Sequence, residues 1–249
     1  MGKRKKIIVI DTEATPIVPM GDKVDPRKMR VYDIGYIIKD KRTPRVYAER
    51  SFVCGDIMFD PRDYMRSAYY AEKLPQYRAN YHDGGEWRIK SFRDVYKAFQ
   101  KDCKDFNVEE IWAFNCRFDA QALDATIADN SNGYIKKFAP RGVKWCDLWR
   151  LAGEHIASTA AYNEWAYSHG FYGETGIAKT GVEPITAYLR GETDFTERHT
   201  ALDDARHEAA ILDYLRYRHY KTPNEWGNGY VQAMKYAKEH GHYKPKNAR

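Results

Sequence analysis

The stretch Lys6-Ile7-Ile8-Val9-Ile10-Asp11-Thr12-Glu13 decides the fold class of this chain. Its four consecutive β-branched apolar residues indicate a short buried strand over 6–11, which ends in an acidic residue. Side chains two apart on an extended chain share a face, so the carboxylates of Asp11 and Glu13 can point into one cleft. Taken alone, such a pair of acids is more often a solvated strand end.

Further strands and helices are expected along the rest of the chain, before and after residues 55–90. Segments 31–39 and 45–54 read as strands joined by a hairpin turn at 40–44, and later strands are expected at 108–114 and 144–147. Ser91, Asn115 and Thr200 are natural helix caps. The expected helices are 91–106, the segment after Asn115, 148–158, 160–169, 184–189, 200–218 and 230–239. A meander followed by α/β crossovers is typical of one α/β domain.

Residues 55–90 form a Tyr/Arg-rich insertion in which periodicity fades, and we expect short helices and loops there. Its aromatic and basic side chains could stack bases and contact phosphates, or simply pack the insertion; it is also a candidate surface for a protein partner. The residues concerned are Tyr64, Tyr69, Tyr70, Tyr77, Tyr81, Trp87, Arg62, Arg66, Arg78 and Arg88.

The composition indicates a class of protein but does not indicate one function. The 249 residues carry 41 basic and 35 acidic side chains, a net charge of +6 that is compatible with a polyanionic partner. No apolar run approaches the roughly 20 residues of a membrane span, and Ile7–Ile10 is shorter than the core of a signal peptide. No pair among Cys54, Cys103, Cys116 and Cys146 has CxxC spacing, which indicates reduced thiols. We therefore expect a cytoplasmic protein that does not bind membranes.

Two further polar clusters lie where an α/β sheet would bring them near Asp11. Asp119 falls in the first turn of the helix after Asn115, where the helix dipole favours a negative charge. His199 directly precedes the helix that carries Asp203 and Asp204. At about 100° per residue, Asp204 falls at the edge of the apolar stripe of that helix and Asp203 falls on the opposite, solvent side. Glu208, by contrast, falls within the stripe.

Together the three clusters resemble the exonuclease motifs of the DnaQ-like (DEDDh) family, within the ribonuclease H-like superfamily. Asp11-x-Glu13 is similar to the first motif, Asn115-x-x-x-Phe118-Asp119 to the second, and His199-x-Ala201-x-x-Asp204 to the third. The resemblance implies a mixed central sheet flanked by helices. It places the exonuclease domain at 1–220, followed by a C-terminal helix and basic tail at 221–249. The continuation Ala14-Thr15-Pro16 departs from the family pattern and puts the seating of the 3′ end in doubt.

The resemblance also implies a two-metal mechanism with Mg²⁺ or Mn²⁺. Asp11 would bridge the cations, Glu13 and Asp204 would complete one site, and Asp119 would support the other. His199 would take a proton from the attacking water.

The implied substrate is the 3′ end of a single-stranded nucleic acid, and the implied products are nucleoside 5′-monophosphates. Ala14 and Asn115 are the candidate substrate-binding residues. DNA is the expected substrate. Two alternatives stay open: an exoribonuclease of the same fold that trims 3′ ends, and a non-catalytic adaptor that uses this fold to bind a partner.

Overall fold

The computed structural model describes residues 5–17, 24–61, 64–67, 75, 77, 88–217 and 229–245. Several predicted nucleic-acid-contacting residues of the insertion lie outside the described residues: Arg62, Tyr69, Tyr70, Arg78, Tyr81 and Trp87, together with the side chains of Arg66 and Arg88. The end of the predicted basic tail, 246–249, also lies outside them.

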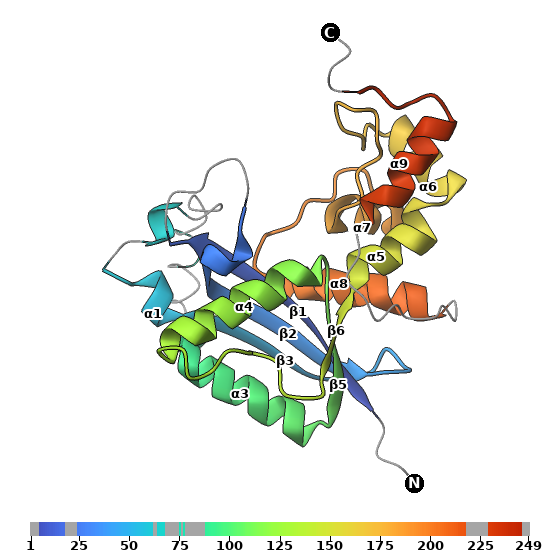
Figure 1. Ribbon diagram of the computed structural model, residues 1–249. Helices are drawn as coiled ribbons and strands as arrows, with labels where there is room; N and C mark the ends of the chain where they lie inside the picture. Colours follow the sequence, from blue (N-terminus) through green and yellow to red (C-terminus); the bar gives the residue numbers. More distant parts are fainter. Residues whose placement is uncertain are drawn as a thin grey trace. The chain divides into compact units, whose positions relative to one another are not determined.

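The described residues form a six-stranded mixed sheet in the order β4-β3-β2-β1-β5-β6 (Figure 1). Strands β1, β2 and β3 make an antiparallel meander. Strand β5, which follows a helix in the chain, pairs in parallel with β1. The strands are β1 (Lys6–Pro16), β2 (Met29–Asp40), β3 (Val46–Cys54), β4 (Arg88–Lys90), β5 (Val108–Ala113) and β6 (Lys144–Asp147). The mixed sheet of an α/β protein is therefore confirmed. Strand β4 is parallel to β3. It was not predicted, because it has only three residues and lies at the end of the aperiodic insertion.

Most helices lie where capping residues and apolar periodicity predict them. They are α1 (Gly55–Met58), α3 (Phe92–Asp105), α4 (Cys116–Asn130), α5 (Leu148–Ala152), α6 (Ala160–Ser168), α7 (Val182–Arg190), α8 (Ala201–Tyr217) and α9 (Tyr230–Glu239). The Ser91 side chain accepts a hydrogen bond from the amide of Asp94 and so caps α3. The single helix expected over 148–158 is wrong in detail, since α5 ends at Ala152 and a π-helical turn continues to Ala157.

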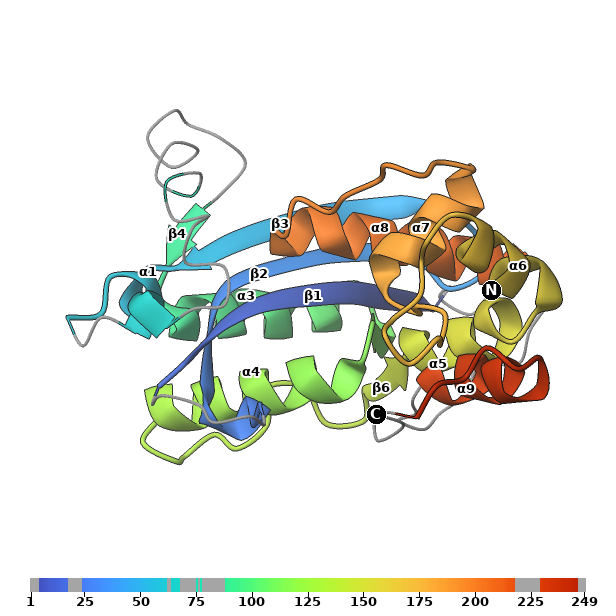
Figure 2. The ribbon, with the colours of Figure 1, turned by 90° about the horizontal axis from the view of Figure 1, so that it is seen from above.

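The described residues group into two compact units. The first comprises residues 1–112, 117–145 and 198–206, and the second 113–116, 146–197 and 207–249. In the first unit, α3 and α4 cover one face of the sheet and the start of α8 covers the other (Figure 2). An aromatic cluster of Phe92, Phe99 and Phe138 fills the space beneath the α3 face. All of the predicted metal ligands fall in this first unit.

The second unit is helical and packs around aromatic side chains. Trp165 stacks on Phe171 with ring centroids 5.0 Å apart and meets Tyr188 edge-on. The backbones of Gly153 and Gly229 approach so closely that a Cβ on Gly153 would lie 2.3 Å from the Gly229 Cα atom. A side chain at either glycine would therefore separate the two segments.

Four cysteines are free and buried, as the absence of CxxC spacing predicts. Among the described residues, every helix is too short or too polar to cross a membrane.

Candidate active site

Strand β1 presents two carboxylates on one face of the sheet. The strand does not end at Asp11, as predicted, but extends to Pro16 because β2 pairs with it along its whole length. Asp11 lies opposite Gly35 and Glu13 lies opposite Asp33. Directly opposed residues share a face. Asp11, Glu13 and Asp33 therefore all face the side of the sheet on which α8 begins.

A β-bulge lies beside Glu13. The register shifts between Glu13, which pairs with Asp33, and Ala14, which pairs with Val31, so Tyr32 is the extra residue on β2. A bulge bends its strand and increases the local twist. The direction of the Glu13 carboxylate is consequently set by the neighbouring strand as well as by its own.

The start of α8 rests directly on β2. A Cβ atom built on Gly35 would lie 2.0 Å from the Leu202 backbone nitrogen and 2.2 Å from the Ala201 carbonyl carbon. Only glycine permits this approach. Asp33 accepts a hydrogen bond at Oδ2 from the amide of Ala201, 3.1 Å away, and thereby caps the helix from another strand. These two contacts fix where the first turn of α8 lies over the sheet.

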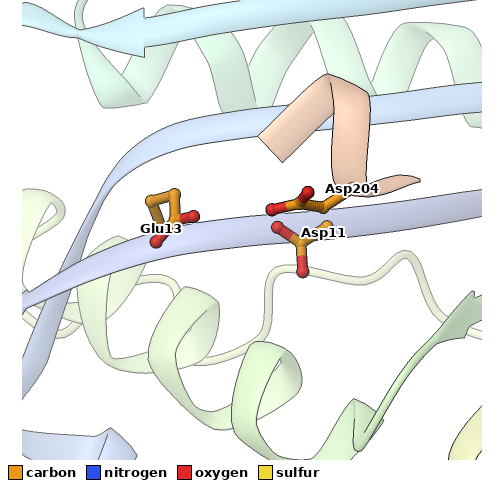
Figure 3. Close-up of side chains that lie close together, drawn as sticks. All are labelled: Asp11, Glu13 and Asp204. Carbon is orange, nitrogen blue, oxygen red and sulfur yellow. The ribbon is translucent and has the colours of Figure 1, made fainter. Parts of the chain in front are cut away.

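Three carboxylates converge between β1 and α8. One oxygen from each of Asp11, Glu13 and Asp204 lies within 4.8 Å of the others, and Figure 3 shows Asp204 facing Asp11 from α8. Glu13 and Asp204 are buried, and Asp11 is half-buried. Like charges this close and this poorly solvated repel one another strongly unless a cation lies among them. An all-carboxylate donor set fits a hard divalent cation such as Mg²⁺ or Mn²⁺.

Asp119 is not a member of this group of three. It is buried on α4, where its Oδ1 accepts a hydrogen bond from the Thr12 hydroxyl at 2.7 Å. Thr12 alternates with Asp11 and Glu13 along β1 and so points toward the other face of the sheet. The contribution of Asp119 to a second cation site stays a prediction.

His199, two residues before α8, adopts an unusual backbone conformation. His199 is half-buried with φ 54°, in the left-handed region that is uncommon for residues with a Cβ. His199 therefore lies in a tight turn, two residues before the first residue of α8. Because such conformations cluster at functional sites, this geometry is compatible with the predicted role of His199.

The two candidate substrate-binding residues lie in different surroundings. Ala14 is buried on β1, just beyond the bulge. Asn115 is exposed, and its φ of 61° is left-handed, whereas a capping residue is extended. The prediction of an ordinary cap at Asn115 is therefore wrong. Asparagine tolerates the left-handed region better than most residues, which suits it to the sharp turn between β5 and α4.

The helix-phase prediction for α8 is confirmed in direction. Asp204 belongs to the carboxylate cluster, and Asp203 does not. Asp203 is not simply solvated as predicted, because it forms ion pairs with Arg206 at 3.0 Å and Arg198 at 3.5 Å. Glu208 is buried within the apolar stripe.

Asp33 and Tyr77 lie beside the cluster; from the sequence, Asp33 was assigned no site role, and Tyr77 was expected only to stack bases or to pack the insertion. Asp33 is fully buried, and desolvation raises the pKa of its carboxyl to about 6. The Tyr77 hydroxyl donates to Asp33 Oδ2 at 2.7 Å, and burial beside that carboxylate raises the pKa of the phenol. An aspartate inside the apolar strand Met29–Asp40 is itself a signal, since buried carboxylates need partners.

Comparisons of the whole chain find similarity in structure only. No family model and no curated protein sequence matches. The nuclease domain of 3′hExo, a DEDDh family member bound to rAMP, superposes with a TM-score of 0.59 at 15% identity, covering 91% of this chain and 99% of that one. A full-length 3′-exonuclease gives a TM-score of 0.59 at 14% identity, over 92% of this chain and 90% of that one. An E. coli exonuclease I complex with single-stranded DNA gives 0.54 at 14% identity, over 95% of this chain but 43% of that one.

These matches extend over both compact units and over nearly the whole length of the 3′hExo domain. The chain thus has the fold of these 3′-exonuclease structures.

Proposed function

We propose that this chain is a metal-dependent 3′→5′ exonuclease acting on single-stranded nucleic acid. The observation that carries the proposal is the convergence of Asp11, Glu13 and Asp204 within 4.8 Å, on the fold of known 3′-exonucleases. Three carboxylates from two elements, each offering an oxygen to one common point, are suited to hold divalent cations.

Asp11, Glu13 and Asp204 would hold one cation, and Asp119 would join Asp11 at a second. When bound, such cations stabilise the negative charge that develops on the oxygens around a phosphodiester phosphorus. Glu13 and Asp204 are buried, so their oxygens are held in place before substrate arrives.

His199 supplies the proton acceptor. Its neutral imidazole nitrogen removes a proton as a water oxygen bonds to the phosphorus of the last phosphodiester. The bond from phosphorus to the 3′ oxygen of the penultimate nucleotide then breaks, and that oxygen takes up a proton. The products are a nucleoside 5′-monophosphate and a strand one nucleotide shorter.

DNA is the proposed substrate and RNA the alternative. Known structures of the same fold include one bound to rAMP and others bound to single-stranded DNA, so the fold accepts both sugars. We expect the strand to enter unpaired, because the three carboxylates are buried or half-buried and the terminal base must unstack to reach them.

The test is a gel with matched DNA and RNA oligonucleotides labelled at either end. Mn²⁺-dependent shortening from the 3′ end, abolished by EDTA and by Asp11→Asn, is expected. Glu164→Gln removes one exposed carboxylate on α6 and is the matched control with wild-type activity. Turnover in excess chelator contradicts the metal-dependent mechanism, and binding of oligonucleotides without any turnover supports the non-catalytic adaptor instead.

A further inference from the structure

Asp33 is a fully buried carboxylate that the proposed chemistry does not use. It lies on β2 directly opposite Glu13 and faces the side of the sheet on which α8 begins. Two donors meet at one of its oxygens: the amide of Ala201 at 3.1 Å and the hydroxyl of Tyr77 at 2.7 Å. Asp33 therefore joins three segments that are distant in the sequence.

The first of these donors belongs to the catalytic helix. Ala201 is the first residue of α8, two positions after His199 and three before Asp204. The first amides of a helix have no partner within the helix, so their direction depends on an external acceptor. Asp33 provides that acceptor at the place where the missing side chain of Gly35 lets the helix approach the strand closely. A shift of this amide would move both His199 and Asp204.

The second donor belongs to the insertion. Tyr77 is 3% exposed and meets Tyr32 edge-on at 5.8 Å. A second attachment lies nearby, since the Thr15 hydroxyl donates to the Tyr64 carbonyl oxygen at 2.5 Å. Thr15 follows Glu13 by two residues on β1, and Asp33 faces Glu13 across the strand pair. Tyr64 therefore contacts β1 two residues after Glu13, a proposed metal ligand, and Tyr77 contacts β2 directly opposite Glu13.

We propose that Asp33 is a positioning residue for His199 and Asp204, and that Tyr77 makes the 55–90 insertion part of the active-site framework. This inference rests on the proposed exonuclease function. Tyr77 holds the Asp33 carboxylate in the orientation that receives the Ala201 amide, so Tyr77 affects turnover through the position of α8.

Tyr77→Phe tests the proposal with the smallest change, because it removes only the hydroxyl. The matched control is Tyr36→Phe: Tyr36 is equally buried on β2, and its hydroxyl donates to Asp102 at 3.0 Å, toward the opposite face of the sheet. Both variants lose one buried hydrogen bond to a carboxylate and should lose similar stability. We expect kcat on a single-stranded oligonucleotide to fall about tenfold in Tyr77→Phe, with KM unchanged, and to stay at the wild-type value in Tyr36→Phe.

Two variants of Asp33 separate its oxygen acceptor from its charge. Asp33→Asn keeps an oxygen for both donors and should retain turnover within about threefold, whereas Asp33→Ala should lose about a hundredfold. Equal losses in both, or equal effects of Tyr77→Phe and Tyr36→Phe on kcat, would overturn the proposal.

Hydrogen exchange at the Ala201 amide gives a measurement that does not depend on activity. Tyr77→Phe should speed this exchange about tenfold, and Tyr36→Phe should leave it unchanged. If the wild-type protein cleaves nothing but the exchange result holds, the proposed function fails and the positioning network stands. If cleavage occurs and the Ala201 amide exchanges at one rate in all variants, the network has no role in positioning the helix.

Discussion

Replacing Gly35 with alanine should inactivate the site without touching a proposed metal ligand. The new Cβ would lie 2.0 Å from the Leu202 nitrogen, 2.2 Å from the Ala201 carbonyl carbon and 2.3 Å from the Leu202 Cα atom. All three are backbone atoms, so no side-chain rotation relieves the contact. Ordinary van der Waals contact begins at 3.4 Å, and 3.4 minus 2.0 leaves a shift of 1.4 Å along the shortest contact.

That shift would fall on the first turn of α8 and carry Asp204 away from Asp11 and Glu13. Their oxygens lie within 4.8 Å of one another, so a displacement of this size is a large part of their spacing. A misplacement of about 1 Å at a reacting centre costs about 10²-fold in rate. Overpacking of this kind costs about 1–3 kcal/mol in the free energy of unfolding. We therefore expect Gly35→Ala to fold, with a lower Tm, and to lose about 99% of its turnover.

The assay is turnover of a single-stranded oligonucleotide under saturating Mn²⁺, alongside thermal unfolding. Gly173→Ala is the matched control: the nearest atom to its new Cβ is the Ile177 carbonyl oxygen at 3.9 Å, an ordinary contact. It should keep wild-type turnover. A Gly35→Ala protein with wild-type kcat and Tm would show that α8 does not rest on β2 as described.

Three other perturbations test the proposed site. Asp204→Asn should abolish turnover, whereas Asp203→Asn, which breaks partly exposed ion pairs, should cost about 0.2–1 kcal/mol in unfolding free energy and leave most activity; a paired assay that finds Asp203 essential would refute the motif register. His199→Ala should reduce kcat about 10²–10⁴-fold while Mn²⁺ affinity, measured by calorimetry, is retained. Mn²⁺ at about a hundred times its Kd should stabilise the wild-type protein by about 2.7 kcal/mol in thermal unfolding, and Asp11→Asn should remove that gain.

The parts of the site set by local periodicity could be predicted from the sequence. Helical phase alone separates Asp204 from Asp203, and the structure buries Ala201, Ala205 and Leu212 on one stripe with Asp204 at its edge. The shared face of Asp11 and Glu13 likewise follows from strand alternation. Each of these features depends only on residues close together in the chain.

Features set by pairing between distant segments were missed. Strand β1 was predicted to end at Asp11, the acidic residue that follows its four apolar residues, yet the antiparallel pairing with β2 extends it to Pro16. The bulge beside Glu13 depends on that same pairing. The hydrogen bond from the Thr12 hydroxyl to Asp119 Oδ1 was likewise not foreseen, and the part of Asp119 in a cation site stays a prediction. No periodicity within one segment encodes which partner a neighbouring strand supplies.

Strand β2 contributes no proposed metal ligand and yet determines where the ligands lie. Gly35 sets how closely α8 approaches the sheet, Asp33 orients the first amide of the helix, and the extra residue Tyr32 changes the register beside Glu13. Each contact acts on the backbone of a segment that carries a carboxylate, so it constrains every side chain on that segment at once. Carboxylates this close together repel one another, which makes the support of the two segments that carry them important. Strand β2, buried along its whole length, therefore supports both segments that bring Asp11, Glu13 and Asp204 within 4.8 Å of one another.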